Sequence, residues 1–348
     1  MAQRKKSSSR SRSQPSGTSP VLVFLLILMG AAFCFSSYLE FGDKEVPASA
    51  VNSFIDKDAD LEIHFIDVGQ GDCSLIKWEG AAVLIDCGER DYADTVLKYL
   101  EKQDVEKLDI IIATHPHSDH IGAMGDVISE IGAERVIAPK VAADMTPTTK
   151  TYERFLTALK DRALKLTAAK PGTVYELTGR TAASVEKQPP KLEILAPLAD
   201  YDDLNDYSVV VRLTYGNTSY LFTGDAEVRA EKDILNSGAD VSADVLKAGH
   251  HGSSTSTSEK FLEAVSPEIC VIQCGEGNSY GHPHAEILER LESSGIKYYR
   301  NDSSGTVTVY SDGEEIFVTA EKGGDGGKSS DKTEKSSKKT KKTKEDDE

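Results

Sequence analysis

Thr114-His-Pro-His-Ser-Asp-His-Ile-Gly122 is the stretch that decides the fold, because it holds three imidazoles and a carboxylate within six residues. The run follows Asp109–Thr114, a short apolar stretch that predicts a buried strand. Imidazole and carboxylate ligands together suit zinc, manganese or iron. In a tight loop alternate residues point the same way, so His115 and His117 can share one ion. Asp119 and His120 can then serve a second.

Two later segments carry ligand types in the same setting, directly after an apolar strand. The first is Tyr220-Leu-Phe-Thr-Gly-Asp225, whose final carboxylate has two oxygens and can bridge two ions, while the glycine lets the backbone approach closely. The second is Val245-Leu-Lys-Ala-Gly-His250-His251-Gly252, with tandem histidines between glycines. Together with the first run, these segments predict a site for two divalent metal ions, Zn²⁺ or Mn²⁺.

The body of the chain predicts one layered α/β domain over residues 61–320, in which expected strands and helices alternate. Its charge is strongly negative. Residues 40–320 hold 26 basic and 49 acidic side chains, a net of −23, within a whole chain of net −17. Such a body repels polyanions at long range, which argues against a protein that coats nucleic acid. The five cysteines are odd in number and scattered, so we expect no disulfide framework.

The two ends of the chain differ from this body. Residues 1–20 are basic and Ser-rich, and we expect a disordered cytoplasmic segment. Residues 21–39 carry no charge and are long enough to cross a bilayer as a helix. The preceding basic residues favour a single-pass signal anchor in the cell membrane, with the catalytic domain outside the cell. A cleaved signal peptide is the alternative. Residues 40–60 predict a polar linker, and residues 321–348 a disordered charged tail.

Longer sequence motifs between Leu61 and Val318 make the prediction of fold and family more specific. They include Phe65-Ile-Asp-Val-Gly-Gln-Gly-Asp72, Leu84-Ile-Asp-Cys-Gly88, Asn205-Asp-Tyr-Ser-Val-Val210, Leu246-Lys-Ala-Gly-His-His-Gly-Ser253 and Asn278-Ser-Tyr-Gly-His-Pro-His284. With the His run, they make the chain resemble the extracellular hydrolase domain of ComEC-type competence proteins, within the metallo-β-lactamase fold superfamily. The resemblance is to the hydrolase module alone, which we expect on a single transmembrane helix.

The resemblance implies an αββα sandwich and assigns a role to each motif residue. His115 and His117 would hold metal one, Asp119 and His120 metal two, and Asp225 would bridge both. Similarity to secreted phosphorylcholine esterases of this fold implies that His251 completes metal two. It also leaves His250 facing the substrate as an acid or hydrogen-bond donor, and makes Glu227 a further acid. The implied catalytic residues are Asp119, His250 and Glu227.

Six further residues are candidates for supporting the ligands or contacting the substrate: Asp67, Asp86, Asn205, Lys247, His282 and His284. Asp67 and Asp86 end early strands, where they either hold ligand imidazoles or serve as turn carboxylates. Asn205 precedes the Gly-Asp strand where many members of the superfamily have a histidine, so metal one keeps a position for water or for Asn205. Lys247 is, like His250, a candidate donor to substrate oxygens. His282 and His284 form either the rim of the site or a polar loop.

Two such cations lower the pKa of a shared water, and the resulting hydroxide attacks phosphorus or a carbonyl carbon. The resemblance implies a phosphodiester substrate, DNA or a nucleotide. The acidic body keeps a smaller ester open, such as a phosphorylcholine ester or a lactone. A non-catalytic binding module associated with DNA uptake is the alternative outside enzymes, and a β-lactamase is disfavoured by the missing upstream histidine. No protein partner is predicted.

Overall fold

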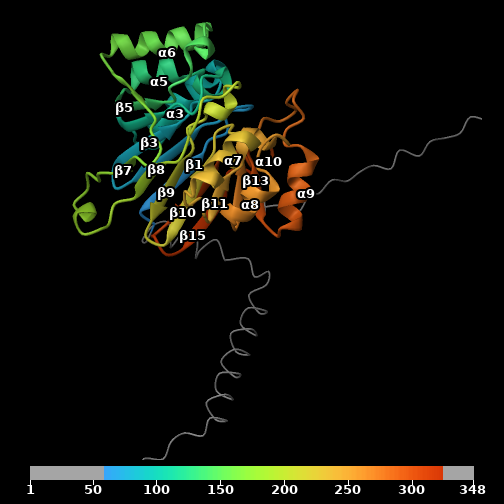
Figure 1. Ribbon diagram of the computed structural model, residues 1–348. Coiled ribbons are helices and arrows are strands. Elements are labelled where there is room, and N and C mark those ends of the chain that lie inside the picture. Colours follow the sequence, from blue (N-terminus) through green and yellow to red (C-terminus); the bar gives the residue numbers. More distant parts are fainter. Residues whose placement is uncertain (1–58, 324–348) are drawn as a thin grey trace, which may run out of the picture. The chain divides into compact units, whose positions relative to one another are not determined.

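The computed structural model describes residues 59–323, which form two mixed β-sheets packed face to face between two layers of helices (Figure 1). In the first sheet the strands lie in the order β15-β14-β1-β2-β3-β4-β5-β6. Their bounds are Ile316–Ala320, Val307–Ser311, Leu61–Phe65, Ser74–Trp78, Ala81–Ile85, Leu108–Ile112, Ala133–Ala138 and Leu166–Ala168.

The second sheet has the order β13-β12-β11-β10-β9-β8-β7. Its strands span Lys297–Arg300, Ile269–Ile272, Val245–Lys247, Thr218–Phe222, Val211–Tyr215, Lys191–Ile194 and Val174–Glu176. The α-helices of the described chain are α3 (Ala93–Lys102), α4 (Ser118–Ile121), α5 (Met124–Glu130), α6 (Lys150–Asp161), α7 (Val228–Ser237), α8 (Glu259–Val265), α9 (Ala285–Ser293) and α10 (Asn301–Ser304).

Strand β3 shows how the sequence produces the layers. All five of its residues, Ala-Ala-Val-Leu-Ile, are buried. Side chains alternate along a strand, so Ala81, Val83 and Ile85 join the core between the two sheets, whereas Ala82 and Leu84 join the core beneath α3, α5 and α6. A strand buried on both faces reads as a continuous apolar run. A third core joins the second sheet to α7, α8 and α9, which completes the αββα arrangement.

The sequence predicted most of the inner strands, but not all elements. It missed α5 and the strands β6, β7, β13 and β15. β6 and β7 have three residues each and are largely exposed, so they carry little apolar signal. The cysteines of the described residues, Cys73, Cys87, Cys270 and Cys274, are buried free thiols.

The predicted N-terminal segments and charged tail fall almost wholly outside the described residues. Among the helices of residues 59–323, none is long and apolar enough to cross a bilayer. The membrane anchor therefore stays a prediction from the sequence.

Candidate metal centre

The predicted ligands lie together because the strands that precede them end at one edge of the two sheets. Strands β3 and β4 run parallel in the first sheet, and β10, β11 and β12 run parallel in the second. The carboxyl ends of parallel strands meet at the same edge. The His run follows β4, Asp225 follows β10, and the tandem histidines follow β11.

The turn Val68–Asp72 packs directly under the His run. The backbone N–H of Asp72 donates to the carbonyl oxygen of Asp119 at 3.1 Å. A Cβ atom on Gly71 would lie 2.5 Å from that same oxygen, so only glycine permits the contact. This close approach brings the carboxylate of Asp72, between β1 and β2, into the site.

The tandem histidines occupy two consecutive left-handed backbone positions, with φ of 49° at His250 and 54° at His251. Such angles are uncommon outside glycine and asparagine, and they cluster at functional sites. Here they turn both imidazoles towards Asp225. The backbone N–H of His250 donates to the carbonyl oxygen of Gly224 at 3.1 Å, which fixes this turn against the Gly-Asp segment.

Asp225 is the hub of the site. Its Oδ2 atom lies 3.2 Å from Nε2 of His120, 3.5 Å from Nε2 of His251 and 3.7 Å from Nε2 of His250. Nε2 of His115 is 3.8 Å away. Four imidazoles from two sheets thus face one buried carboxylate oxygen.

Two groups of ligand atoms surround this oxygen. On one side, Nε2 of His115 and Nδ1 of His117 are 3.0 Å apart. On the other, Oδ2 of Asp119 lies 3.2 Å from Nε2 of His251 and 3.9 Å from Nε2 of His120. Ligands of a tetrahedral zinc ion with bonds of 2.0–2.1 Å are about 3.3 Å apart, so both groups have the spacing that a cation requires.

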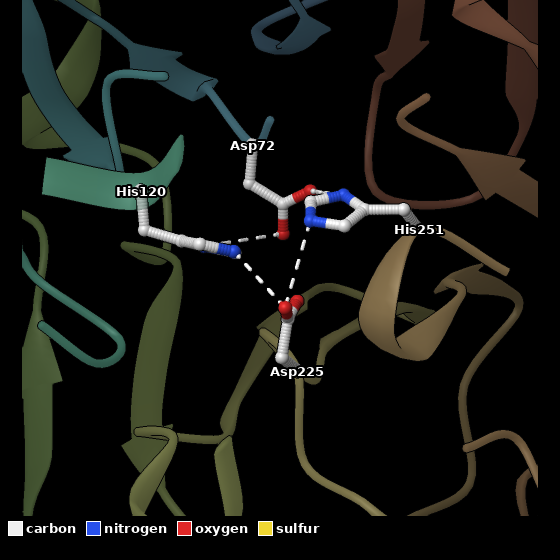
Figure 2. Close-up of side chains that lie close together, drawn as sticks. All are labelled: Asp72, His120, Asp225 and His251. Atoms are coloured by element: carbon white, nitrogen blue, oxygen red, sulfur yellow. Dashed lines mark ion pairs between the residues drawn. The ribbon is translucent and has the colours of Figure 1, made fainter. Parts of the chain in front are cut away.

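Carboxylates hold the opposite nitrogens of two of these rings. Oδ2 of Asp86 lies 2.8 Å from Nδ1 of His120. Oδ1 of Asp72 lies 3.2 Å from Nδ1 of His251, and Figure 2 shows these two side chains facing each other. The carbonyl oxygen of Gln273 accepts from the same nitrogen of His251 at 2.9 Å. A carboxylate behind a ligand imidazole fixes its tautomer and its orientation. Asp86 thus contacts one of the imidazoles that the sequence predicts as metal ligands.

The contacts decide between the two roles predicted for Asp67 in favour of a turn carboxylate, and they correct the role predicted for Lys247. Asp67 does not contact an imidazole in the described structure: its carboxylate accepts from the backbone N–H of Gly69 and pairs with Lys322 at 3.6 Å. The residue that takes the expected role is Asp72, for which the sequence predicted no role of its own.

The predicted role of Lys247 as a donor to substrate oxygens is wrong, because Lys247 is 2 % exposed and cannot reach a substrate. Its ammonium group donates to the carbonyl oxygen of Gly224 at 3.0 Å and pairs closely with Oδ2 of Asp72. It is a counter-charge beneath the site, not a donor to substrate.

Cations fit this set of residues. Asp72, His120, Asp225 and His251 form a buried group whose ligand atoms all lie within 4.8 Å of one another. The buried atoms of residues 59–323 that lack a hydrogen-bond partner include Nε2 of His120 and Oδ1 of Asp225. Buried polar atoms are normally paired, so these orphaned atoms indicate a missing ligand.

The electrostatics point the same way. Four carboxylates, those of Asp72, Asp86, Asp119 and Asp225, contact the imidazoles of the site. The permanent cation beside them is Lys247, which pairs with Asp72 and lies 4.0 Å from Asp225. Burial alone would raise the pKa of Asp225, but the neighbouring imidazoles of His120 and His251 hold it well below its usual range. For His251 burial alone would lower the pKa, yet Asp225 and Asp72 raise it to about 10. The site therefore carries surplus negative charge, which divalent cations neutralise.

A cleft of about 540 Å³ opens over this hub. Its walls are mostly polar and come from both halves of the domain: Gln70, Pro116, His117, Ser118, Asp119, Thr149, Thr151, Asn205, Asp225, His250, His251, Tyr280 and His282. Asn205 is nearly buried, and its Oδ1 lacks a hydrogen-bond partner among the described residues. This unpartnered oxygen belongs to a residue that lines the same cleft as His117.

His250 and His282 line this cleft, whereas Glu227 and His284 lie behind the residues that do. Oε1 of Glu227 lies 3.2 Å from Nδ1 of His250 and accepts from Thr255 at 2.8 Å. Burial and the nearby histidines lower the pKa of His282 to about 4. His284 instead holds the loop, since its Nδ1 accepts from the backbone N–H of Ser254 at 2.9 Å. The rim prediction thus fits His282, and the polar-loop reading fits His284.

Comparison with known proteins agrees with this geometry. Residues 66–276 match the model of the metallo-beta-lactamase superfamily. The chain belongs to this superfamily. Within it, the chain is 29% identical over 265 residues to ComE operon protein 3 of Bacillus subtilis, a match that covers 71% of this chain and 32% of that protein.

Two further relatives share this pattern. Recombination protein 2 of Haemophilus influenzae is 28% identical over 255 residues, covering 71% of this chain and 28% of that protein. Competence protein ComA of Neisseria gonorrhoeae is 29% identical over 245 residues, covering 69% of this chain and 31% of that protein. The chain thus carries a metallo-beta-lactamase domain homologous to competence proteins, as the sequence predicted, and spans about a third of their length.

Proposed function

We propose that this chain is a membrane-anchored extracellular hydrolase that binds two divalent cations, Zn²⁺ or Mn²⁺, and cleaves phosphodiesters of DNA or of a nucleotide. The observation that carries the proposal is the position of Asp225 Oδ2, within 3.2–3.8 Å of four imidazole Nε2 atoms. A single carboxylate oxygen faced by ligands from two sheets suits a bridge between two cations.

Each cation has its own set of donors in this proposal. His115 and His117, with Asp225 and the free oxygen of Asn205, hold the first. Asp119, His120 and His251, with Asp225, hold the second. Oδ1 of Asp72 lies at Nδ1 of His251, whereas Oδ2 lies at Nδ1 of His120 and pairs with Lys247. Asp72 therefore orients the two rings instead of binding the cation.

When bound, the two cations supply an activated water and neutralise charge on the substrate oxygens. His250 differs from the ligand histidines because its side chain is 23% exposed to the cleft. Glu227 and Thr255 hold Nδ1 of His250 from behind. Its Nε2 is then positioned to donate a hydrogen bond, or a proton, to a phosphate oxygen of the substrate. Glu227 acts through His250 as a positioning residue.

The phosphodiester class is supported by the homology to competence proteins and by the polar walls of the cleft. Anchoring and an extracellular position are supported by the sequence of residues 1–39. The acidic body repels a polyanion at long range, so the substrate must gain its affinity from the cations and from short contacts in the cleft.

The test is hydrolysis of bis-p-nitrophenyl phosphate by the full-length chain, with Zn²⁺ or Mn²⁺ and after removal of metal by a chelator. We expect turnover with metal, and its loss in Asp119→Ala. Asp67→Asn is the matched control, because that carboxylate lies outside the site, and it should keep wild-type turnover. Equal rates in the wild type and Asp119→Ala would refute the proposal.

A substrate panel then separates the classes of ester. Single-stranded DNA, duplex DNA, a phosphorylcholine ester and a lactone are compared at equal metal loading. Preference for the DNA substrates supports the proposal, whereas preference for either small ester would replace it. Metal binding without turnover of any substrate would favour a binding module.

A further inference from the structure

Tyr280 is an exposed aromatic side chain at the rim of the metal cleft. It is 65% exposed, and the other large hydrophobic side chains that are exposed in residues 59–323 are all aliphatic. It lines the same cleft as His117, Asp119 and Asp225. An exposed ring at the mouth of a polar cleft is a candidate for contact with a ligand.

The loop holds this ring in a fixed place. Oδ1 of Asn278 accepts from the backbone N–H of Tyr280 at 3.2 Å and of His282 at 3.0 Å. Its Nδ2 donates to the carbonyl oxygens of Gly275 and His282 at 2.9 and 2.6 Å. The ring nitrogen Nε2 of His284 lies 3.3 Å from the carbonyl oxygen of Tyr280. Because the backbone is clamped, a ligand would order little more than the Tyr280 side chain.

The ring also stacks against a second ring that leads into the site. Tyr280 lies on His282 with centroids 5.6 Å apart and an angle of 20° between the planes. The ring of His282 lies 5.5 Å from that of His250. His282 stacks against one side of Tyr280, and Tyr280 stays 65 % exposed, so ring surface remains for a ligand. The rings of Tyr280, His282 and His250 thus form a row that leads from solvent to Asp225.

We propose that Tyr280, stacked on His282, is a platform for an unpaired nucleobase next to the phosphodiester that is cleaved. The inference rests on the proposed function and names its substrate class: nucleotides and single-stranded nucleic acid. Stacking on an aromatic ring is tolerant of sequence and requires a base outside a duplex. Stacking also attracts a nucleic acid at short range, whereas the acidic domain repels it at long range.

A choline headgroup is the competing ligand for an exposed aromatic ring. Quaternary ammonium groups are bound by cages of several aromatic faces. Here the described cleft offers Tyr280 as its exposed aromatic residue, with one face already covered by His282. A flat base needs a single face, so the geometry favours it.

The first experiment compares two esters with the same leaving group, thymidine 5′-(p-nitrophenyl phosphate) and methyl p-nitrophenyl phosphate, in the full-length metal-loaded chain. The ratio of their kcat/KM values reports on the nucleoside alone. We expect Tyr280→Ala to lower this ratio about tenfold and Tyr280→Phe to keep it near the wild-type value. Val185→Ala, at an exposed site outside the cleft, is the control and should leave the ratio unchanged.

An unchanged ratio in Tyr280→Ala, or an equal fall in Tyr280→Phe, would overturn the inference while leaving phosphodiester hydrolysis intact. A loss of turnover on p-nitrophenyl phosphorylcholine that exceeds the loss on the thymidine ester would also overturn it, in favour of a choline site. Absence of turnover on every ester in the wild type would instead count against the proposed function.

The second experiment measures stacking without turnover. A single-stranded oligonucleotide with 2-aminopurine is titrated with the Asp119→Asn chain, and stacking is followed by quenching of its fluorescence. We expect quenching that is lost when Tyr280→Ala is added, kept with Tyr280→Phe and weaker with the duplex form. Equal quenching with and without the Tyr280 ring would overturn the inference even if no ester is hydrolysed.

Discussion

Two buried regions of this domain hold histidine, and they differ in the charge around it. His120 in the metal centre faces Asp86, Asp119 and Asp225. His64, on β1 against α3, contacts the hydroxyls of Tyr99 at 3.0 Å and Thr308 at 3.2 Å, and one carboxylate, Glu62, at 3.2 Å. The other seven histidines of the chain lie in the segments that follow β4, β11 and β12 around the site.

The pKa values show the consequence. Burial lowers the pKa of His64, and the single carboxylate does not reverse this. Burial opposes protonation of His120 as well, but Asp225, Asp86 and Asp119 raise its pKa well above the ordinary value. Burial alone therefore does not mark a functional histidine. A surplus of buried carboxylates around the histidine is the better mark, because their negative charge has to be neutralised by cations. Hydroxyl groups carry no such charge.

The largest effect should follow from removing the hub of the metal centre. Asp225→Asn keeps the shape of the side chain but loses the charge that four imidazoles face. We expect bound metal to fall well below the wild-type content and phosphodiester hydrolysis to fall roughly 100-fold or more. Elemental analysis and initial rates check this. Wild-type metal content in Asp225→Asn would contradict the bridging role.

Removal of metal should lower the stability of the domain through the metal centre, and the size of this loss should not depend on His64. Metal that is present at 100 times its Kd stabilises the native state by about 2.7 kcal/mol. A chelator should thus lower the thermal midpoint by roughly 5–10 °C, and Zn²⁺ or Mn²⁺ should restore it. The same shift is expected in His64→Gln. A midpoint insensitive to chelator would mean that the surplus carboxylates are neutralised by protons.

A smaller effect separates the two strand-end carboxylates, Asp72 and Asp67. Asp72→Asn should weaken metal binding roughly 10- to 100-fold, because the rings of His120 and His251 lose their orienting charge. Asp67→Asn is matched to it in chemistry and should keep wild-type affinity. Chelator competition measures both. Equal affinities in the two variants would remove Asp72 from the centre.

The smallest effect concerns stability near His64. His64→Gln should cost about 1–3 kcal/mol of unfolding free energy at pH 7, through lost hydrogen bonds, with metal content unchanged. The folded pKa of His64 is below its ordinary value of 6.5, so the unfolded chain binds the proton first as pH falls. The stability that neutral His64 contributes is therefore present above pH 6.5 and lost below it.

Denaturant unfolding of the wild type and His64→Gln across this range checks the sign. The difference between the two proteins should shrink as the pH falls below 6.5. The groups that face His64, namely Glu62, Lys77, Tyr99 and Thr308, are the same in both proteins. A difference that grows on acidification would contradict the assignment.

Much of the fold was predictable because the central strands are buried on both faces. Ala81–Ile85 is an apolar run that Asp86 follows, and Leu108–Ile112, apolar except for Asp109, leads to the His115–His120 run. The edge strands β6 and β7 and the helix α5 were not predictable in the same way. The two strands are short and exposed, and pairing with a neighbouring strand decides their structure. Helix α5 is also short, and its packing against α6 decides its structure.

The sequence by itself determined which residues leave the strand ends: the His115–His120 run, Asp225 and the tandem His250-His251. Short-range spacing suffices for that, since a tight turn fixes the direction of neighbouring side chains. Only the tertiary structure decided that Asp72 and not Asp67 reaches a ligand imidazole, and that Lys247 is a buried counter-charge. Those roles depend on how the β1–β2 turn packs against the loops of the second sheet. No local pattern records such a long-range contact.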